Sequence, residues 1–204
     1  MVTAAVLAGG QARRLGGQDK SRFVVGGRTI LERELDALRP LASRVVIVAD
    51  DPARFAGTGL PVVADSRPGC GSLGGIYTAL TLGDGPVLVL ACDMPFVSSA
   101  FLARVTRAGR EADVAIPRTA DGYHPLCASY APSCAAAIRA RLDSGALKAT
   151  GFLPDVRVRE IGPVEIAPFD PDGLLLLNVN TPADLALAQD AVRRRGGTPE
   201  RASS

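Results

Sequence analysis

Short apolar runs alternate along the chain with longer segments in which apolar residues recur three or four positions apart. The apolar runs predict buried strands at residues 3–8, 45–48, 60–64, 86–91 and 156–161. The wider spacing predicts helices at residues 30–40, 72–82, 98–108, 132–142 and 182–194. This alternating order predicts an α/β fold, a three-layer α/β/α domain in which a mostly parallel sheet lies between two layers of helices.

The run at residues 86–91 is apolar throughout, which is typical of a central strand in a parallel sheet. Thr181 and Pro182 have the residue types favoured at the start of a helix, and they open the last predicted helix. We expect a single domain over residues 1–190. The chain is polar from Arg193 onward, and we expect residues 191–204 to form a disordered tail.

Composition and charge exclude several classes of protein. The formal net charge is only +2, the basic residues are dispersed and tryptophan is absent, so a nucleic-acid partner is not expected. The four cysteines show no Cys-x-x-Cys spacing and the chain has a single histidine, which argues against a zinc site and a disulfide scaffold. The sequence has neither a signal-peptide pattern nor an apolar run of membrane-spanning length. We therefore expect a cytoplasmic protein without a membrane partner.

The first predicted strand ends in a glycine-rich turn at residues 8–20, with the sequence Ala-Gly-Gly-Gln-Ala-Arg-Arg-Leu-Gly-Gly-Gln-Asp-Lys. Glycines let backbone N–H groups approach an anion closely. The guanidinium of Arg13 matches phosphate oxygens, and Lys20 adds a compact positive charge. At the carboxyl end of a strand this combination predicts a phosphate-binding loop, with an ordinary surface loop as the alternative. A Walker sequence is excluded, because Gly17 is not followed directly by lysine.

Two aspartates follow predicted strands and are candidates for the same site. Asp93 comes after the strand at residues 86–91, so its carboxylate is expected to face the crevice where α/β proteins bind ligands. A carboxylate beside a triphosphate is repelled unless a cation lies between them, which makes Asp93 a candidate Mg²⁺ ligand. The alternative for Asp93 is a helix or turn cap. Asp65 directly follows the strand at residues 60–64 and is a weaker candidate for contact with base, ribose or metal. The alternative for Asp65 is a turn cap.

The glycines at positions 69, 71 and 74 fit a dinucleotide-binding fingerprint, with Asp93 about twenty residues further on. However, residues 65–68 separate these glycines from the preceding strand, and the first predicted strand carries a different glycine loop. A Rossmann dehydrogenase is therefore not favoured. We expect instead that residues 71–75 let the start of a helix lie close to a nucleotide base.

Two further motifs carry polar side chains. Asn178 and Asn180 precede the last helix and would point the same way in an extended segment, although turn-forming asparagines are the alternative. The single histidine, His124, lies in a polar turn between residues 114–116 and 126–130, which predict a hairpin. A surface or edge position is expected for it, and no Ser/His/Asp or Cys/His set can be assembled around it.

Together these motifs resemble the molybdenum cofactor guanylyltransferase family. The resemblance extends from residue 3 to about residue 190 in the family's order and approximate spacing. Arg13 and Lys20 match the family's nucleotide loop, in which Leu15 replaces the usual methionine. The other matching segments are residues 7–10, 65–66, 71–75, 92–95, 124–126 and 178–182.

The resemblance implies a Rossmann-like nucleotidyltransferase fold and transfer of GMP from GTP to the terminal phosphate of molybdopterin-bound molybdenum, with release of pyrophosphate. It implies catalytic roles for Arg13, Lys20 and Asp93, with Mg²⁺ as the cofactor on Asp93, and places Asn178 and Asn180 near the pterin. Molybdoenzyme-specific chaperones or an upstream molybdenum-insertion protein would be further partners. The implied nucleotide-binding residues are Leu7, Ala8, Gly9, Gly10, Arg13, Lys20, Asp65, Gly74 and Asp93.

The preference for guanine rests on Leu-Ala-Gly-Gly at residues 7–10, where related cytidylyltransferases usually have Thr-Ala-Ala-Gly. Asp50 and residues 118–122 depart from the family pattern. A molybdopterin cytidylyltransferase and a sugar-1-phosphate nucleotidyltransferase are the alternative enzymes. The alternative from outside the enzyme class is a GTP-binding sensor, which would bind GTP without releasing pyrophosphate.

Overall fold

A computed structural model of the protein describes residues 2–9 and 22–196. Its strands are β1 (Val2–Leu7), β2 (Val24–Val25), β3 (Arg28–Thr29), β4 (Ala42–Ala49), β5 (Val62–Ala64), β6 (Val87–Ala91), β7 (Val114–Thr119), β8 (Gly122–Tyr123), β9 (Cys127–Tyr130) and β10 (Val158–Ile161). Its α-helices are α1 (Ile30–Leu38), α2 (Gly71–Leu80), α3 (Ser99–Ala108), α4 (Cys134–Asp143), α5 (Pro163–Ile166) and α6 (Pro182–Gly196). Short 3-10 helices are η3 (Pro52–Thr58), η4 (Leu153–Asp155) and η5 (Ala167–Phe169).

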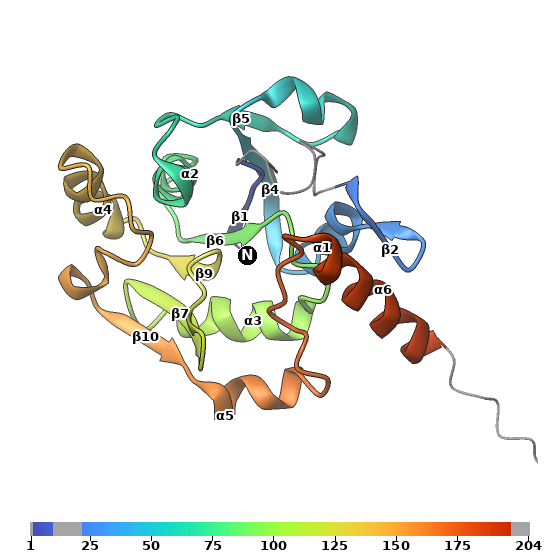
Figure 1. Cartoon of the computed structure of the whole chain (residues 1–204). Helices are drawn as coiled ribbons and strands as arrows, with labels where there is room; N and C mark the ends of the chain where they lie inside the picture. Colours follow the sequence, from blue (N-terminus) through green and yellow to red (C-terminus); the bar gives the residue numbers. More distant parts are fainter. Residues whose placement is uncertain (1, 10–21, 197–204) are drawn as a thin grey trace, which may run out of the picture.

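The main sheet is mixed, in the order β10-β7-β9-β6-β1-β4-β5, and β8 pairs with β7 at its side (Figure 1). β9 runs antiparallel to β6 and β7, whereas the pairs β10–β7, β6–β1, β1–β4 and β4–β5 are parallel. β6 is buried along its whole length and lies near the middle of the sheet, as its continuous apolar run predicts. The predicted three-layer α/β/α fold is confirmed.

The two faces of the sheet pack against different helices, and β1 shows how the sequence achieves this. Successive side chains of a strand point to opposite faces. Ala4 and Val6 belong to one buried cluster together with residues of α1 and α3, whereas Ala5 and Leu7 belong to a second cluster with residues of α2 and α4. Figure 1 shows α2 and α3 on opposite sides of the sheet. Two apolar layers therefore hold the strands and fix where their ends lie.

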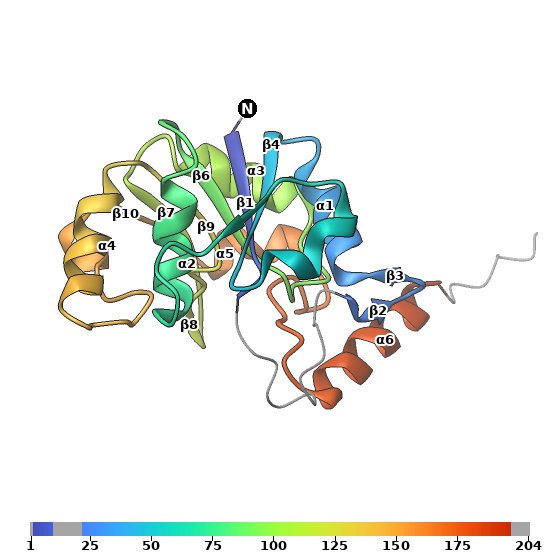
Figure 2. The same ribbon diagram turned by 90° about the horizontal axis from the view of Figure 1, so that it is seen from above.

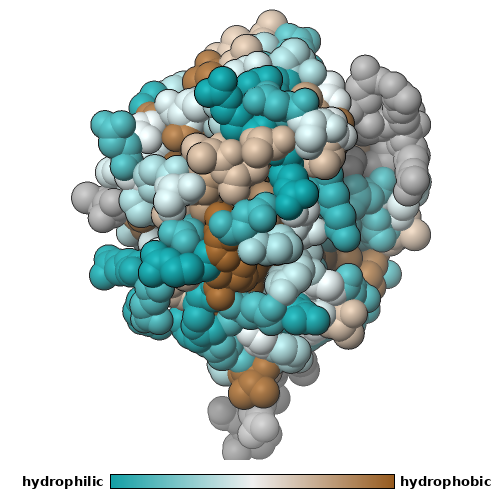
Figure 3. Space-filling view, turned by 90° about the vertical axis from the view of Figure 1, so that its left-hand side faces the viewer, coloured by the Kyte–Doolittle hydropathy of each residue, from teal (hydrophilic) through white to brown (hydrophobic). Residues whose placement is uncertain are grey.

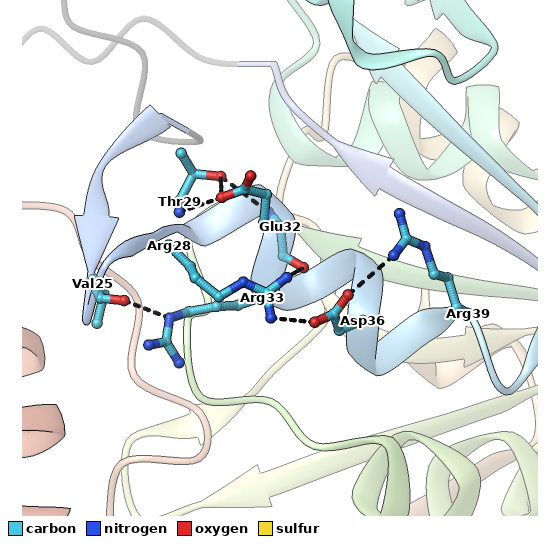
Figure 4. Close-up of polar contacts among 7 residues, drawn as sticks. All are labelled: Val25, Arg28, Thr29, Glu32, Arg33, Asp36 and Arg39. Carbon is cyan, nitrogen blue, oxygen red and sulfur yellow. Dashed lines mark hydrogen bonds and ion pairs between the residues drawn. The ribbon is translucent and has the colours of Figure 1, made fainter. Parts of the chain in front are cut away.

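Helix α1 begins at Ile30 because the residue before it forms a capping box (Figure 4). Thr29 Oγ1 accepts a hydrogen bond from the Glu32 backbone N–H at 3.2 Å, and the Glu32 carboxylate accepts one from the Thr29 N–H at 2.7 Å. One turn into the helix, Arg33 Nε donates to the Val25 carbonyl at 2.7 Å. These bonds fix the direction in which α1 leaves the β2–β3 hairpin.

The β2–β3 hairpin packs against α6, and sequence analysis did not predict it, because each strand has only two residues (Figure 2). Gly26 and Gly27 have φ angles of +60° and +76°, as a type I′ turn requires. A Cβ on Gly26 would lie 2.4 Å from Val192 Cγ1 of α6, so this glycine also permits the close approach of the helix.

Helix α6 extends to Gly196, so residues 191–196 of the segment expected as a tail are helical. Arg195 in its last turn donates from Nε to Asp172 at 2.8 Å, and its guanidinium lies 4.9 Å from the ring centre of Phe96. These contacts tie the end of α6 to the segment between η5 and α6 and to the loop after β6. Residues 197–204 lie outside the described part of the chain.

The predicted cap at Thr181 is confirmed, Ser98 caps α3 in the same way, and the predicted hairpin is more elaborate than expected. Ser98 Oγ accepts from the Phe101 N–H at 3.2 Å, and Thr181 Oγ1 accepts from the Asp184 N–H at 3.2 Å. β7 continues to Thr119 and pairs with both β8 and β9, so part of the predicted turn is strand. Other predicted boundaries differ from the observed ones by a few residues.

Candidate functional site

The order of strands reverses between β1 and β6. The chain passes from β1 to β4 and β5 on one side of the sheet and then returns to β6 on the other side of β1. In open α/β sheets, ligands bind beyond the carboxyl ends of the strands at such a reversal, which we call the switch point. Leu7 pairs in register with Ala91, and the Cys92 N–H donates to the Leu7 carbonyl at 3.2 Å. The segments that follow β1 and β6 therefore begin side by side.

The glycine-rich turn leaves β1 at the switch point. Leu7 and Ala8 are buried, the Ala8 N–H donates to the Val48 carbonyl at 2.8 Å, and Gly9 is exposed. Gly10, Arg13 and Lys20 lie outside the described residues. Their roles stay predictions, but the strand that leads to them ends between the ends of β4 and β6.

Asp93 lies two residues beyond β6, on the same edge of the sheet as Gly9. Its backbone carbonyl accepts a hydrogen bond from the Val179 N–H at 2.8 Å. Val179 is buried, whereas Asn178 is exposed and Asn180 is partly exposed, which is the alternation expected of an extended segment. The structure therefore brings Asp93 and the segment with both asparagines together, although they lie far apart in the sequence.

A carboxyl group that sequence analysis did not consider also lies here. Glu34 of α1 is fully buried, and its Oε1 accepts from the Met94 backbone N–H at 2.9 Å. Burial raises the pKa of Glu34 well above its usual value; the Met94 N–H opposes this shift, and the nearby Asp93 carboxylate adds to it. The sequence held a signal, because Glu34 interrupts the apolar face that Leu31, Leu35 and the rest of α1 present to the core.

The Asp65 carboxylate holds the turn between β5 and α2. Its Oδ1 accepts from the Arg67 N–H at 2.9 Å and from Thr78 Oγ1 at 2.6 Å. This is the turn-capping interpretation that the sequence left open. Because β4 and β1 separate β5 from β6, Asp65 lies three strand spacings of about 4.8 Å from the strand of Asp93. Contact of Asp65 with a nucleotide stays a prediction.

Gly74 lies in the first turns of α2, where the chain itself fills the space beside it. A Cβ on Gly74 would lie 2.7 Å from the Arg67 carbonyl oxygen, and one on Gly75 would lie 3.0 Å from Leu7 Cδ1. The two glycines thus let α2 pack directly against the turn at residues 65–67 and against β1. This packing explains both glycines, and a contact of Gly74 with a base stays a prediction.

We expect Gly74→Ala to destabilise the protein by about 1–3 kcal/mol, because the new methyl group would overlap a backbone carbonyl held in a turn. The better helix propensity of alanine offsets about 1 kcal/mol of a larger steric cost. Gly83→Ala is the matched control, since nothing lies within 4 Å of its Cβ position and its φ is not positive. Denaturant unfolding measures both free energies, and equal stability of the two variants would contradict the expectation.

Asp50 is a second residue that the sequence argument did not assign to the site. It follows β4 directly, and a Cβ on Gly9 would lie 3.5 Å from Asp50 Oδ1. Asp50, Asp65 and Asp93 share one signal in the sequence, a carboxylate placed within two residues of the end of a parallel strand. Asp50 departs from the pattern of the family that the motifs resemble, and its place after β4 is the signal that associates it with the site.

His124 also reaches this edge, because β9 begins where β6 ends. Leu90 pairs in register with Cys127, and the Ala91 N–H donates to the Leu126 carbonyl at 2.8 Å. The His124 ring Nε2 lies 2.9 Å from Thr119 Oγ1, and burial lowers the pKa of the imidazole. His124 is therefore a neutral, half-buried side chain near neutral pH, fixed by Thr119.

The donor groups at the switch point fit a magnesium ion shared with a substrate. Within residues 2–9 and 22–196, no three His, Cys, Asp or Glu side chains form a group that could hold a metal alone. Mg²⁺ commonly takes one or two protein carboxylates and completes its shell with phosphate oxygens and water. A single carboxylate at Asp93, on the same edge of the sheet as the start of the turn predicted to bind phosphate, matches that requirement.

On the face seen from the side of α4, apolar side chains form small patches among polar ones (Figure 3). None of the helices in the described ranges combines the length and the apolar character needed to cross a bilayer. The strand reversal and the carboxylates at this edge make the switch point the candidate ligand site, and a phosphorylated ligand there stays a prediction from the residue types of the glycine-rich turn.

Comparison with known proteins gives a consistent picture. Residues 4–156 match the model of the MobA-like NTP transferase domain. The molybdenum cofactor guanylyltransferase of Desulfosudis oleivorans is 32% identical over 194 residues, which cover 94% of this chain and 96% of that protein. The crystal structure of molybdopterin-guanine dinucleotide biosynthesis protein A from Archaeoglobus fulgidus has a TM-score of 0.82 and 29% identity, and covers 95% of this chain and 100% of that one.

A protein from Mycobacterium tuberculosis that was solved in complex with manganese has the same fold. Its TM-score is 0.65 at 23% identity, with coverage of 93% of this chain and 98% of that one.

Proposed function

The chain belongs to the MobA-like NTP transferase family, and we propose that it transfers GMP from GTP to the terminal phosphate of molybdenum-bound molybdopterin. The products are the guanine dinucleotide form of the cofactor and pyrophosphate. The name carried by a relative of nearly equal length supports this activity. The structural observation that carries the proposal is the register of Leu7 with Ala91, because it starts the glycine-rich turn beside the segment of Asp93.

The transfer is an in-line displacement at the α-phosphorus of GTP. An oxygen of the acceptor phosphate forms a bond to this phosphorus, and the bond to the oxygen that bridges to the β-phosphate breaks. The electron pair of that bond leaves with pyrophosphate. Such a reaction asks the protein mainly to position two substrates and to stabilise negative charge.

The residues at the switch point have types suited to these tasks. Arg13 and Lys20 would hold the triphosphate, with backbone N–H groups around Gly9 and Gly10. Asp93 would hold Mg²⁺, which when bound neutralises charge on the α-phosphate and on the departing pyrophosphate. The bond from Val179 to the Asp93 carbonyl supports the proposal that Asn178 and Asn180 lie on the pterin side.

We expect GTP to bind more tightly than CTP. The Leu-Ala-Gly-Gly sequence at residues 7–10 and the glycine-rich start of α2 are the features that favour guanine. Titration calorimetry with each nucleotide and Mg²⁺ measures the two affinities, and ATP serves as a purine control. Equal affinities, or tighter binding of CTP, would contradict the guanine assignment and favour a cytidylyltransferase.

The activity itself is tested by incubating the protein with each nucleoside triphosphate, Mg²⁺ and either the pterin acceptor or a hexose 1-phosphate. Pyrophosphate release with GTP and the pterin is the expected result. Release only with the sugar phosphate would indicate a sugar-1-phosphate nucleotidyltransferase. Binding of GTP without any release would indicate a nucleotide sensor.

A further inference from the structure

The backbone that carries Asp93 has no regular structure to hold it. β6 ends at Ala91 and α3 begins at Ser99, so residues 92–98 lie between a strand and a helix. A side chain on such a segment takes its position from the peptide groups on either side of it. The placement of the Asp93 carboxylate therefore depends on what fixes the Asp93–Met94 peptide.

Both polar groups of that one peptide are hydrogen-bonded to distant parts of the chain. Its carbonyl, on Asp93, accepts from the Val179 N–H at 2.8 Å, and its N–H, on Met94, donates to Glu34 Oε1 at 2.9 Å. Because a peptide group is planar, two bonds on opposite sides fix the orientation of the whole plane. That plane sets ψ of Asp93 and φ of Met94, and so the direction of the chain at Asp93.

The Glu34 bond is made at a position where α1 otherwise buries apolar residues. Ile30, Leu31 and Leu35 are buried on the same helix, and Glu34 is fully buried among them. Burying a carboxyl group costs free energy that an apolar side chain would not cost. What the buried carboxyl group provides is a hydrogen-bond acceptor for the Met94 N–H, which lies 60 residues further along the chain.

We propose that Glu34 is a positioning residue for Asp93: it holds the Asp93–Met94 peptide from the core side, opposite Val179, and so fixes where the Asp93 carboxylate meets the metal. The inference rests on the proposed function, because it concerns the residue that would bind Mg²⁺ there. Glu34 touches neither substrate nor metal in this assignment. What it contributes is a hydrogen-bond acceptor that α1 holds in a fixed place beside the Met94 N–H.

Glu34→Leu and Glu34→Gln separate this role from simple packing. Leucine fills the space but leaves the buried Met94 N–H without its acceptor, whereas the glutamine amide oxygen can take the same bond. Removing a group that orients a metal ligand typically costs about 10- to 100-fold in metal affinity. We expect that loss in Glu34→Leu and an affinity close to that of the unchanged protein in Glu34→Gln.

The measurement is Mn²⁺ affinity by electron paramagnetic resonance, in the presence of a GTP analogue whose α–β bridge cannot be cleaved. A second readout is hydrogen exchange at the Met94 amide, which should be faster in Glu34→Leu and protected in Glu34→Gln. Leu38→Ala is the control for destabilised packing, since Leu38 is fully buried one turn along the same helix. It should lower the melting temperature and leave Mn²⁺ affinity unchanged.

Unchanged Mn²⁺ affinity in a folded Glu34→Leu protein would overturn the inference, as would a Glu34→Gln protein as weak as Glu34→Leu. If Glu34→Leu does not fold, Glu34→Asp replaces it, because it keeps the carboxyl but shortens its reach by one methylene, and the same loss is expected. Pyrophosphate release by the unchanged protein tests the proposed function separately from the role of Glu34. Failure to release pyrophosphate from GTP with any acceptor would refute the proposed function, whereas a normal Glu34→Leu beside an active parent would refute only the role of Glu34.

Discussion

Asp93→Asn is expected to abolish Mg²⁺-dependent transfer while leaving the fold almost unchanged. Asparagine keeps the size and the hydrogen-bonding shape of the side chain but removes the negative charge that attracts the cation. A bound metal stabilises the negative charge that develops in such reactions and so lowers the activation free energy by several kcal/mol. Loss of the metal therefore corresponds to a fall in rate of at least about 100-fold. The backbone carbonyl that accepts from Val179 is retained in the variant, so the local chain keeps its anchor.

The measurement is pyrophosphate release as a function of Mg²⁺ concentration, with thermal melting as the test of folding. Asp84→Asn is a matched control, because Asp84 is exposed and precedes β6 at the opposite end of the same strand. It should behave like the unchanged protein in both assays. Near-normal transfer by a stable Asp93→Asn protein at ordinary Mg²⁺ would refute the metal role and leave Asp93 as a turn residue.

The sequence predicts the central strands of this fold well because they are buried on both faces. The run at residues 86–91 has no polar interruption, and only a central strand covered by helices can hide it. The same logic fails for the β2–β3 hairpin, whose two-residue strands are too short to show a period. Its position is set by Gly26 against Val192, a contact between segments far apart in the chain.

In the candidate site too, some residues can be assigned from the local sequence, and others only from contacts between distant segments. A carboxylate after an apolar run, as at Asp93, can be read from the sequence because the position alone brings it to the ligand edge. Glu34 could not be assigned this way, because its role depends on which backbone N–H it meets. Met94 becomes its neighbour only when α1 folds against the sheet near the segment that follows β6. Gly74 shows a different ambiguity: its pattern predicts a ligand contact, which stays a prediction, and the Arg67 carbonyl beside it is a structural reason for glycine that the sequence does not reveal.

Lys20→Ala is expected to lower turnover by about 10- to 150-fold and to leave the melting temperature unchanged. Lys20 lies outside the described residues, so this expectation comes from its place at the end of the glycine-rich turn. A charge-assisted hydrogen bond to phosphate is worth about 1.5–3 kcal/mol, which converts to that range of rates when the contact is made to the reacting nucleotide. GTP affinity should fall in the same direction, because the ground state carries much of the same charge.

Lys148→Ala provides the control, because Lys148 is the other lysine of the chain and its exposed side chain lies beyond α4, away from the switch point. Both variants lose one positive charge, so a general effect of net charge on GTP binding would appear in both. The expected result is a loss confined to Lys20→Ala, seen in calorimetry with GTP and in pyrophosphate release. A folded Lys20→Ala protein with the parent's GTP affinity and rate would mean that the turn after β1 does not hold the triphosphate.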